Sequence, residues 1–340
     1  MSGSETKPLL ITQGDPAGVG LELTLKAWQH REKFALSPFA LVADPSHLAS
    51  LVQHLQWDVP IREVSENTIL STFDQALPVI PLNSKVRARP GHPDPATALS
   101  TLESIETSVA LALAGKISGI VTNPVAKYVL LEAGFQHRGS DEFITTLVEK
   151  HLNKPVRSVL LLWSDLLSVV PVTTDVPLTD VPLCLTSELI VNTASIVAKD
   201  LVKRFGINRP RLAITGLNPH AGENGGLGTE DRDIIAPAIT LLRRRNIDAR
   251  GPYSADSLFH ERARSGYDAA LAMYHDQALI PIRTLAVDSA VNVTLGLPLV
   301  RVAPSHGTAF DIAGRGTANA YNLISAIRLA AKLVKTENIN

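Results

Sequence analysis

The 340-residue chain contains a single cysteine, Cys184. One cysteine excludes an intrachain disulfide and is typical of a reducing compartment. With no partner pattern around it, we expect Cys184 to be a small buried apolar residue. No run approaches the roughly 18 to 20 apolar residues of a membrane span, and the polar start, Met1 to Lys7, lacks the apolar core of a signal peptide. These absences predict a soluble cytoplasmic protein.

The sequence also has no excess of charge of either sign, because 32 basic and 33 acidic residues leave a formal net charge of −1. This balance argues against a nucleic-acid or anionic-membrane partner. The sequence has no internal repeat, no Walker G-K-[ST] loop and no G-x-G-x-x-G fingerprint, although Gly14 to Gly20 forms a tight glycine-containing turn. What is present is a 45% apolar composition, which at this length predicts a large core and two α/β domains or lobes.

A glycine-rich loop, Gly216 to Glu230, lies between an apolar β-branched run at 211–215 and a helical pattern at 231–242. Ligands collect at the carboxyl ends of strands in open α/β sheets. His220, held in this loop beside an acid and several glycines, can therefore coordinate a ligand or transfer a proton. The alternative is a turn histidine that caps its own loop.

A second apolar run, 269–274, ends in His275, Asp276 and Gln277. Two histidines at one sheet edge suggest a metal such as Zn, Co, Ni or Mn, which needs at least one more protein ligand. The strand predicted at 166–174 is followed by Asp175, which is the candidate for that third ligand, with Asp180 as a competitor that caps a helix.

Two further segments follow predicted strands. Lys127 comes after the run 119–122 and can either meet an anionic substrate or be an exposed helix lysine. The motif from Arg301 to Gly314 is rich in small residues, which would let a nucleotide lie against the backbone.

Six motifs in this order cover nearly the whole chain: G-D-P-A-G-V-G, V-T-N-P-x-A-K, G-L-N-P-H-A-G-E, M-Y-H-D-Q, N-V-T-L-G-L-P and S-H-G-T-A-F-D-I-A-G. Together they resemble the 4-hydroxythreonine-4-phosphate dehydrogenase family of pyridoxal phosphate biosynthesis. The resemblance implies a two-lobed α/β fold like that of isocitrate and isopropylmalate dehydrogenases, with the active site in the interlobe cleft and completed across a homodimer. Residues 1–130 with 285–340 would form the nucleotide-side lobe, and residues 131–284 the lobe for metal, substrate and dimerisation.

The resemblance also implies roles for individual residues. Metal ligands would be His220 and His275, the latter from the other subunit, with Asp175 where the family has a third histidine. The implied catalytic residues are Lys127, Asp256 and Asp276. The implied substrate contacts are Ser140, Asp141, Arg283, Asn292 and Arg301. The implied contacts to NAD or NADP are Gly296, Pro298, His306, Gly307, Thr308 and Asp311.

Four of these positions depart from the family pattern. Asp175 replaces a histidine, and a carboxylate favours harder ions such as Mg or Mn over Zn or Co. Ser140 and Asp141 replace the family's His-Thr pair, so a carboxylate would repel a nearby phosphate or carboxylate. Arg283 replaces a lysine, which keeps the charge and changes the donor geometry.

Three functional hypotheses follow from the resemblance and its departures. The first is NAD(P)- and divalent-metal-dependent oxidation of 4-phosphohydroxy-L-threonine, followed by decarboxylation to 3-amino-2-oxopropyl phosphate. The second keeps this chemistry but applies it to another hydroxy acid, such as a threonate phosphate or an aromatic dihydrodiol dicarboxylate. The third is a binding or regulatory paralogue without catalysis.

Overall fold

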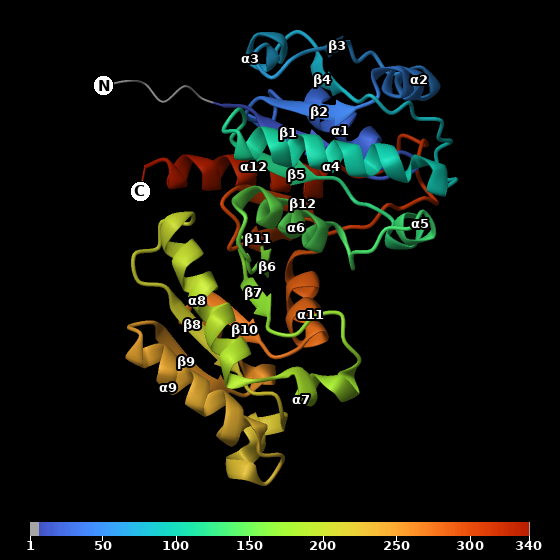
Figure 1. Ribbon diagram of the computed structural model, residues 1–340. Coiled ribbons are helices and arrows are strands. Elements are labelled where there is room, and N and C mark those ends of the chain that lie inside the picture. The colour runs from blue at the N-terminus through green and yellow to red at the C-terminus, as the bar shows by residue number, and fades with distance from the viewer. Residues whose placement is uncertain (1–6, 340) are drawn as a thin grey trace. The chain divides into compact units, whose positions relative to one another are not determined.

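The computed structural model describes residues 7–339, which form two compact α/β units (Figure 1). Unit 1 contains the chain up to Ser158 and the segment Leu297–Val334, whereas unit 2 contains Val159–Gly296 and the end of the chain from Lys335. The predicted lobes placed residues 131–158 in the second lobe and residues 285–340 in the first, whereas the structure places 131–158 in unit 1, and 285–296 and the end of the chain from Lys335 in unit 2. The role assigned to each lobe stays a prediction, and most of the polar start lies outside the described residues.

Unit 1 is built on a fully parallel sheet with strand order β3-β4-β2-β1-β5-β12. Its central strands are short buried apolar runs, as in β1, where all four residues are buried. Such runs are typical of strands covered on both faces. The strands are β1 (Leu9–Thr12), β2 (Phe39–Ala43), β3 (Ile61–Glu63), β4 (Leu77–Pro81), β5 (Gly119–Thr122) and β12 (Val300–Pro304).

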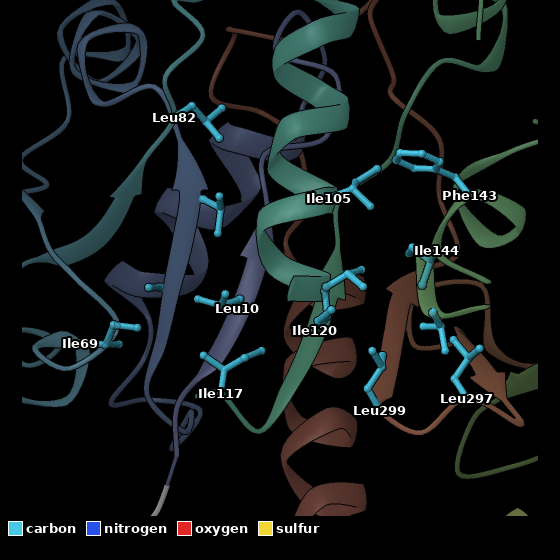
Figure 2. Close-up of a cluster of buried hydrophobic side chains, with 14 residues drawn as sticks. Leu10, Ile69, Leu82, Ile105, Ile117, Ile120, Phe143, Ile144, Leu297 and Leu299 are labelled. Atoms are coloured by element: carbon cyan, nitrogen blue, oxygen red, sulfur yellow. The ribbon is translucent and has the colours of Figure 1, made fainter. Parts of the chain in front are cut away.

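The helices of unit 1 are α1 (Gly20–Gln29), α2 (Pro45–Leu55), α3 (Ile69–Thr72), α4 (Ala98–Leu113), α5 (Lys127–Glu132), α6 (Ser140–Leu152) and α12 (Tyr321–Glu337). Helix α4 packs on β1, β2 and β5, and α6 packs against α4. Figure 2 shows the resulting core, in which Leu10, Ile105, Ile120, Ile144 and Leu299 gather from both strands and helices. This packing fixes the start of α6, where two predicted substrate residues lie.

Unit 2 has the strand order β11-β6-β7-β10-β8-β9. Strands β7, β10, β8 and β9 run parallel, whereas β6 is antiparallel to both of its neighbours. The hairpin of β6 and β7 confirms the strand pair predicted at 159–174. The strands are β6 (Val159–Trp163), β7 (Ser168–Pro171), β8 (Arg211–Thr215), β9 (Asp248–Tyr253), β10 (Ala269–Ala272) and β11 (Val291–Leu295).

The helices of unit 2 are α7 (Val181–Cys184), α8 (Ser187–Lys203), α9 (Ala236–Arg244), α10 (Glu261–Arg264) and α11 (His275–Ala286). Helix α11 packs across β6, β7 and β10, and α8 packs against α9. No single helix in residues 7–339 is long and apolar enough to cross a membrane. The bent pair Leu178–Cys184 and Ser187–Lys203, with an 88° angle between its parts, passes the length and composition test only when both parts are combined.

The prediction that Cys184 is buried is wrong, because this residue is exposed at the end of α7. In this four-residue helix only Val181 is buried, and the neighbouring Leu183 is 83% exposed. A short helix that buries one residue cannot cover its other side chains.

A buried ion network joins α8 to the end of the chain and to the turn after β11. Arg204, 1% exposed, donates from Nη1 to Asp200 at 3.4 Å and from Nε to Glu337 at 3.2 Å. Asp200 also accepts the Gly296 backbone N–H at 2.8 Å. Removing one member would leave a buried charge without its partner, which is far more costly than losing a surface pair.

We expect Asp200→Ala to lower the free energy of unfolding by about 3–5 kcal/mol. The buried Arg204 would keep only the more exposed Glu337 as a counter-charge, and the Gly296 N–H would lose its acceptor. Asp233→Ala is the matched control, since Asp233 is half-exposed and pairs with Arg232 on the surface, where the loss should stay below about 1 kcal/mol. Chemical denaturation of both variants measures the difference. Equal losses of unfolding free energy in the two variants would show that the buried network stabilises the fold no more than a surface ion pair does.

Candidate active site

The carboxyl edge of the parallel strands in unit 2 brings four predicted site residues to neighbouring positions. Asp175 follows β7, His275 follows β10, His220 follows β8 and Asp256 follows β9. Because these strands are adjacent in the order β7-β10-β8-β9 and parallel, their carboxyl ends share one edge. This edge is where ligands bind in open α/β sheets.

The His220 loop contains a left-handed turn. Five consecutive residues, from His220 to Asn224, have positive φ angles between 43° and 75°. Four of them are not glycine, and the left-handed conformation costs such residues roughly 1–2 kcal/mol each. Backbone strain of this kind concentrates at functional sites, because the surrounding structure must hold it in place.

Asp231 holds this loop from the first turn of the following helix. Its buried carboxylate accepts the N–H of Leu217 at 2.9 Å, the N–H of Asn218 at 3.2 Å and the Asn218 side-chain amide at 3.0 Å. Sequence reasoning treated Asp231 only as the start of a helix. The sequence around Asp231 does not indicate a role in holding the loop, since acidic residues are common in first helical turns.

We expect Asp231→Ala to loosen the loop and to lower the affinity for a divalent metal by about 10- to 100-fold, as is typical for residues that orient a ligand. Metal titration of the variant measures this effect. Asp233→Ala, two residues further on and exposed, should bind metal like the unchanged protein. A variant at position 231 with full metal affinity would mean that the loop geometry does not depend on this carboxylate.

Gln277 ties the ends of β8 and β10 together. Its Oε1 accepts from the Thr215 hydroxyl at 2.7 Å and from the Met273 N–H at 2.6 Å, while its Nε2 donates to the Gly216 carbonyl at 2.9 Å. The amide oxygen and one N–H of the amide nitrogen are thus used in bridging the two loops. The sequence motif included Gln277, but its bridging role depends on strand order and could not be predicted.

His275 is the first residue of α11, and its Nδ1 atom is buried without a hydrogen-bond partner among the described residues. Beside it lies an open hollow of about 400 Å³ along one face of α11, lined by His275, Asp276, Leu279, Ile280, Arg283 and Thr284. All of these residues come from one helix, so this wall of the hollow belongs to α11 alone. Arg283, a predicted substrate contact, is exposed there.

Asp175 and Asp256 are both exposed at this edge. The Ser254 hydroxyl donates to Asp256 and is the main cause that lowers the pKa of the Asp256 carboxyl, with a smaller contribution from His220. Asp256 is therefore an anion at neutral pH and lies near His220. Asp175 has a positive φ of 54°, a conformation that aspartate tolerates better than most residues.

The donor chemistry of Asp175, His220 and His275 suits a divalent metal, because imidazole nitrogens and carboxylate oxygens are common ligands of Mn, Co and Zn. Within residues 7–339 of one chain, however, no group of three or more His, Cys, Asp or Glu side chains is arranged to hold an ion. Strand order thus brings the three to one edge without closing a complete three-ligand site.

Three predicted substrate residues meet in unit 1 around Arg301, on β12. Its guanidinium donates to the Thr122 hydroxyl from Nε at 3.0 Å and from Nη2 at 2.7 Å, and Nη2 also reaches the Ser140 hydroxyl at 3.4 Å. Nη1 forms an ion pair with Asp141. Thr122, at the end of β5, was missed as a member of this cluster because a buried strand threonine carries no functional signal.

Lys127, the first residue of α5, lies beside the same cluster. A Cβ built on Gly139, the residue before Ser140, would lie 3.2 Å from Cε and 3.8 Å from Nζ of Lys127. The lysine side chain is exposed. Unit 1 thus places two cations and one carboxylate near the start of α6.

The segment predicted to contact a nucleotide packs against the first glycine loop of unit 1. The Val19 N–H donates to the Thr308 carbonyl at 3.0 Å. His306 Nε2 is buried without a partner among residues 7–339, while its Nδ1 contacts the Gly307 carbonyl at 2.8 Å. Burial lowers the pKa of the His306 imidazole, so the ring is neutral at pH 7. Asp311 and Pro298 are exposed in the same unit.

Two remaining predicted residues belong to unit 2. Asn292, on β11, has a side-chain oxygen that is buried without a hydrogen-bond partner in the described part of the chain. Gly296 follows this strand with a φ of 84° and is held by Asp200. A buried acceptor without a donor is costly, and a polar ligand group would relieve that cost.

The two units thus define a class of protein. It is an α/β protein with side chains that can ligate a metal at one sheet edge and with charged side chains that can bind a small polar ligand. The chain belongs to the family of the pyridoxal phosphate biosynthetic protein PdxA, whose model matches residues 35–330. The family resemblance drawn from the motifs is therefore confirmed.

Relatives of this family match the chain over nearly its whole length. A 4-hydroxythreonine-4-phosphate dehydrogenase of Methylorubrum populi is 53% identical over 334 residues, covering 98% of this chain and 96% of the relative. A 4-hydroxythreonine-4-phosphate dehydrogenase of Bradyrhizobium diazoefficiens is 50% identical over 341 residues, covering 98% of this chain and 99% of the relative.

Solved structures confirm the predicted α/β fold class. The crystal structure of 4-hydroxythreonine-4-phosphate dehydrogenase from Klebsiella pneumoniae matches with a TM-score of 0.83 at 31% identity, covering 97% of this chain and 100% of that one. The crystal structure of a terephthalate 1,2-cis-dihydrodiol dehydrogenase from Burkholderia xenovorans matches with a TM-score of 0.65 at 25% identity, covering 96% of this chain and 98% of that one.

Proposed function

We propose that the protein oxidises 4-phosphohydroxy-L-threonine with NAD or NADP and releases CO2 to give 3-amino-2-oxopropyl phosphate, a step of pyridoxal phosphate biosynthesis. The observation that carries this proposal is the shared carboxyl edge of β7, β10, β8 and β9, which collects the metal-type donors and Asp256. Relatives at 50–53% identity that carry this activity in their names support it.

Asp175, His220 and His275 would hold the divalent metal, which when bound polarises substrate oxygens and stabilises negative charge on them. The carboxylate of Asp175 favours Mg or Mn over Zn. The Nδ1 of His275 is buried without a partner in the described part of the chain, which supports this assignment, since such a nitrogen is costly to keep.

The other residues of the chain bind, orient and move protons. We assign Asp256, held anionic by Ser254, and Asp276 to accepting hydrogen bonds or a proton from the substrate hydroxyl. Lys127 supplies a proton donor for the carbon that loses CO2. The substrate is oriented by Asn292, Arg283, Arg301, Ser140 and Asp141. Residues 296–298 and 306–311 would hold NAD or NADP, which when bound would supply the hydride acceptor.

We further propose a homodimer in which His275 acts in the partner's site. Among residues 7–339, the hollow beside His275 is lined by α11 alone. Ile280 on α11, Val287 just after this helix and Leu183 on α7 are large exposed apolar residues. Such side chains are typical of an interface. The single cysteine and the chemistry of the substrate support a cytoplasmic location.

A second candidate is the same chemistry on another hydroxy acid. It is favoured by the substitutions in the substrate-contact set and supported by the match to the terephthalate dihydrodiol dehydrogenase structure. The substrates of this candidate would be threonate phosphates or dihydrodiol dicarboxylates.

Reduction of NAD or NADP at 340 nm by metal-supplemented protein tests the proposal directly. We expect turnover with 4-phosphohydroxy-L-threonine and its loss on adding a chelator. Turnover only with another hydroxy acid would favour the second candidate. Absence of turnover together with absence of metal and nucleotide binding would favour a non-catalytic paralogue.

A further inference from the structure

A second hollow of unit 2 lies at the amino edge of β8 and β9, opposite the edge where His220 and Asp256 follow these strands. Its volume is about 780 Å³, within the roughly 300–1,000 Å³ that is typical of small-molecule sites. Its walls are the second half of α8, the connection from α8 to β8, and the end of α9 with the turn into β9. Helix α8 packs against α9 here (Figure 1). The hollow is therefore separate from the candidate active site.

Three cationic side chains from different elements line this hollow. Lys199 comes from α8, Arg209 from the residues before β8 and Arg243 from the last turn of α9, and all three residues are exposed. Arg243 donates from Nε to the Ala249 carbonyl at 2.8 Å. Within residues 7–339, neither Lys199 nor Arg209 forms a salt bridge. The charges of these two side chains are therefore not matched by a carboxylate of the described chain.

Asp248 is the only acid among the described residues that line the hollow, and it is already paired. Its carboxylate accepts from Nε of Arg250 at 2.9 Å and from Nη2 of Arg250 at 2.8 Å. This two-point ion pair neutralises the Asp248 charge. The hollow therefore has an excess of positive charge, and the exposed Arg244 and Arg245, next to Arg243 in the chain, add to the positive potential.

The helix dipole explains only part of this charge. Basic residues are favoured in the last turn of a helix, which accounts for Arg243 at the end of α9. Lys199 lies one turn before the end of α8, where Lys203 is the basic residue of the last turn, and Arg209 lies outside the helices. Positive charges gathered around one hollow repel one another, and a bound anion would offset this repulsion.

The hollow also has an apolar wall, which favours an organic anion over a simple inorganic one. Val202 on α8, 39% exposed, lines the hollow together with Ala198 and Ile247. A phosphate monoester carries about −1.5 to −2 charge at pH 7 and three acceptor oxygens, so it can bind several cations at once. Arginine binds such oxygens with two parallel N–H donors. The organic group of the ester would then cover the apolar wall.

We propose that this hollow is a binding site for a small phosphate monoester, separate from the site of catalysis. Lys199, Arg209 and Arg243 bind the phosphate oxygens, and the organic group packs against Val202 and Ile247. Because the hollow and the His220 edge are at opposite ends of the same strands, the ester and a substrate can be bound at the same time. The proposal goes beyond the proposed function and does not depend on it.

The test measures binding of phenyl phosphate and of inorganic phosphate to the full-length protein by calorimetry. We expect phenyl phosphate to bind severalfold more tightly than inorganic phosphate, because its ring covers the apolar wall. Lys199→Gln and Arg209→Gln should each weaken the binding of phenyl phosphate by about tenfold, the value of one charge-assisted hydrogen bond. Thermal melts check that each variant is folded.

Arg262→Gln is the matched control, because Arg262 is an exposed arginine of unit 2 on α10, outside the hollow. It should bind phenyl phosphate like the unchanged protein. Arg283→Gln locates any competing site, since Arg283 is assigned to the substrate. No binding of phenyl phosphate to the unchanged protein would overturn the proposal. Binding that is weakened by Arg283→Gln and not by Lys199→Gln or Arg209→Gln would also overturn it.

Chemical labelling of the unchanged protein gives a second readout that needs no variant. Acetic anhydride modifies exposed lysines, and mass spectrometry measures the extent of modification at each one. We expect phenyl phosphate to protect Lys199 severalfold, whereas Lys154, an exposed lysine of unit 1, should be modified as before. Equal modification of Lys199 with and without phenyl phosphate would contradict its role in this site. Neither readout requires turnover, so failure of the proposed function would not alter them.

Discussion

Replacing His275 by alanine is expected to reduce turnover by at least about a thousandfold, because a catalytic metal supplies several kcal/mol of charge stabilisation. His275 begins α11 shortly after β10, and its buried Nδ1 has no hydrogen-bond partner among the described residues that the substitution would disturb. The melting temperature should therefore change little. Steady-state kinetics and thermal melts of the variant give both quantities.

His151→Ala is the matched control, because His151 is an exposed residue in the last turn of α6. It should keep full activity. A His275→Ala variant with more than a few per cent of normal turnover would show that His275 is not required for catalysis.

The same residue also tests the proposed sharing of the site between subunits. If His220 and His275 of one site come from different chains, a refolded mixture of His220→Ala and His275→Ala proteins should recover activity. Random pairing makes half of the dimers mixed, and each mixed dimer has one intact site, so recovery should reach about a quarter of normal turnover. No recovery would argue that both histidines act within one chain.

The second large effect is expected at Asp175. Asp175→Ala should weaken metal binding by about a hundredfold or more, since one of three protein ligands is lost. Asp175→His should shift the preference from Mg or Mn toward Zn or Co, because imidazole suits these softer ions. Metal content after dialysis against defined metal mixtures measures both changes.

Asp165→Ala serves as the control, since Asp165 is an exposed carboxylate in the loop between β6 and β7 of the same unit. Its metal content should match that of the unchanged protein. An unaltered metal profile in both Asp175 variants would exclude Asp175 as a ligand.

The sequence predicted where the strands end but not how they lie side by side. The runs before Asp175, His220 and His275 are visible in the sequence as apolar segments, and each contains a strand in the structure. Their adjacency depends on the order β7-β10-β8, which follows from long-range packing and leaves no local pattern. This is why the bridging side chain of Gln277 was not assigned a role.

Side-chain partners were the other feature that the sequence left open. Asp141 was expected to repel an anionic substrate, and its charge is indeed exposed, but its pairing with Arg301 joins β12 to α6 across 160 residues. Similarly, the left-handed turn at His220 could not be predicted, because Ala221 and Glu223 do not favour positive φ. The buried Asp231 that helps to hold this loop resembles an ordinary first-turn acid in the sequence.

The most direct test of the account follows both products of a single reaction. 4-Phosphohydroxy-L-threonine labelled with 13C in its carboxylate is incubated with the metal-loaded protein and NAD or NADP. We expect labelled CO2 and reduced nucleotide to form in equal amounts, because oxidation of the hydroxyl gives a β-keto acid that loses its carboxylate. Reduced nucleotide without labelled CO2, or neither product under conditions where metal and nucleotide bind, would contradict oxidative decarboxylation as the function of this protein.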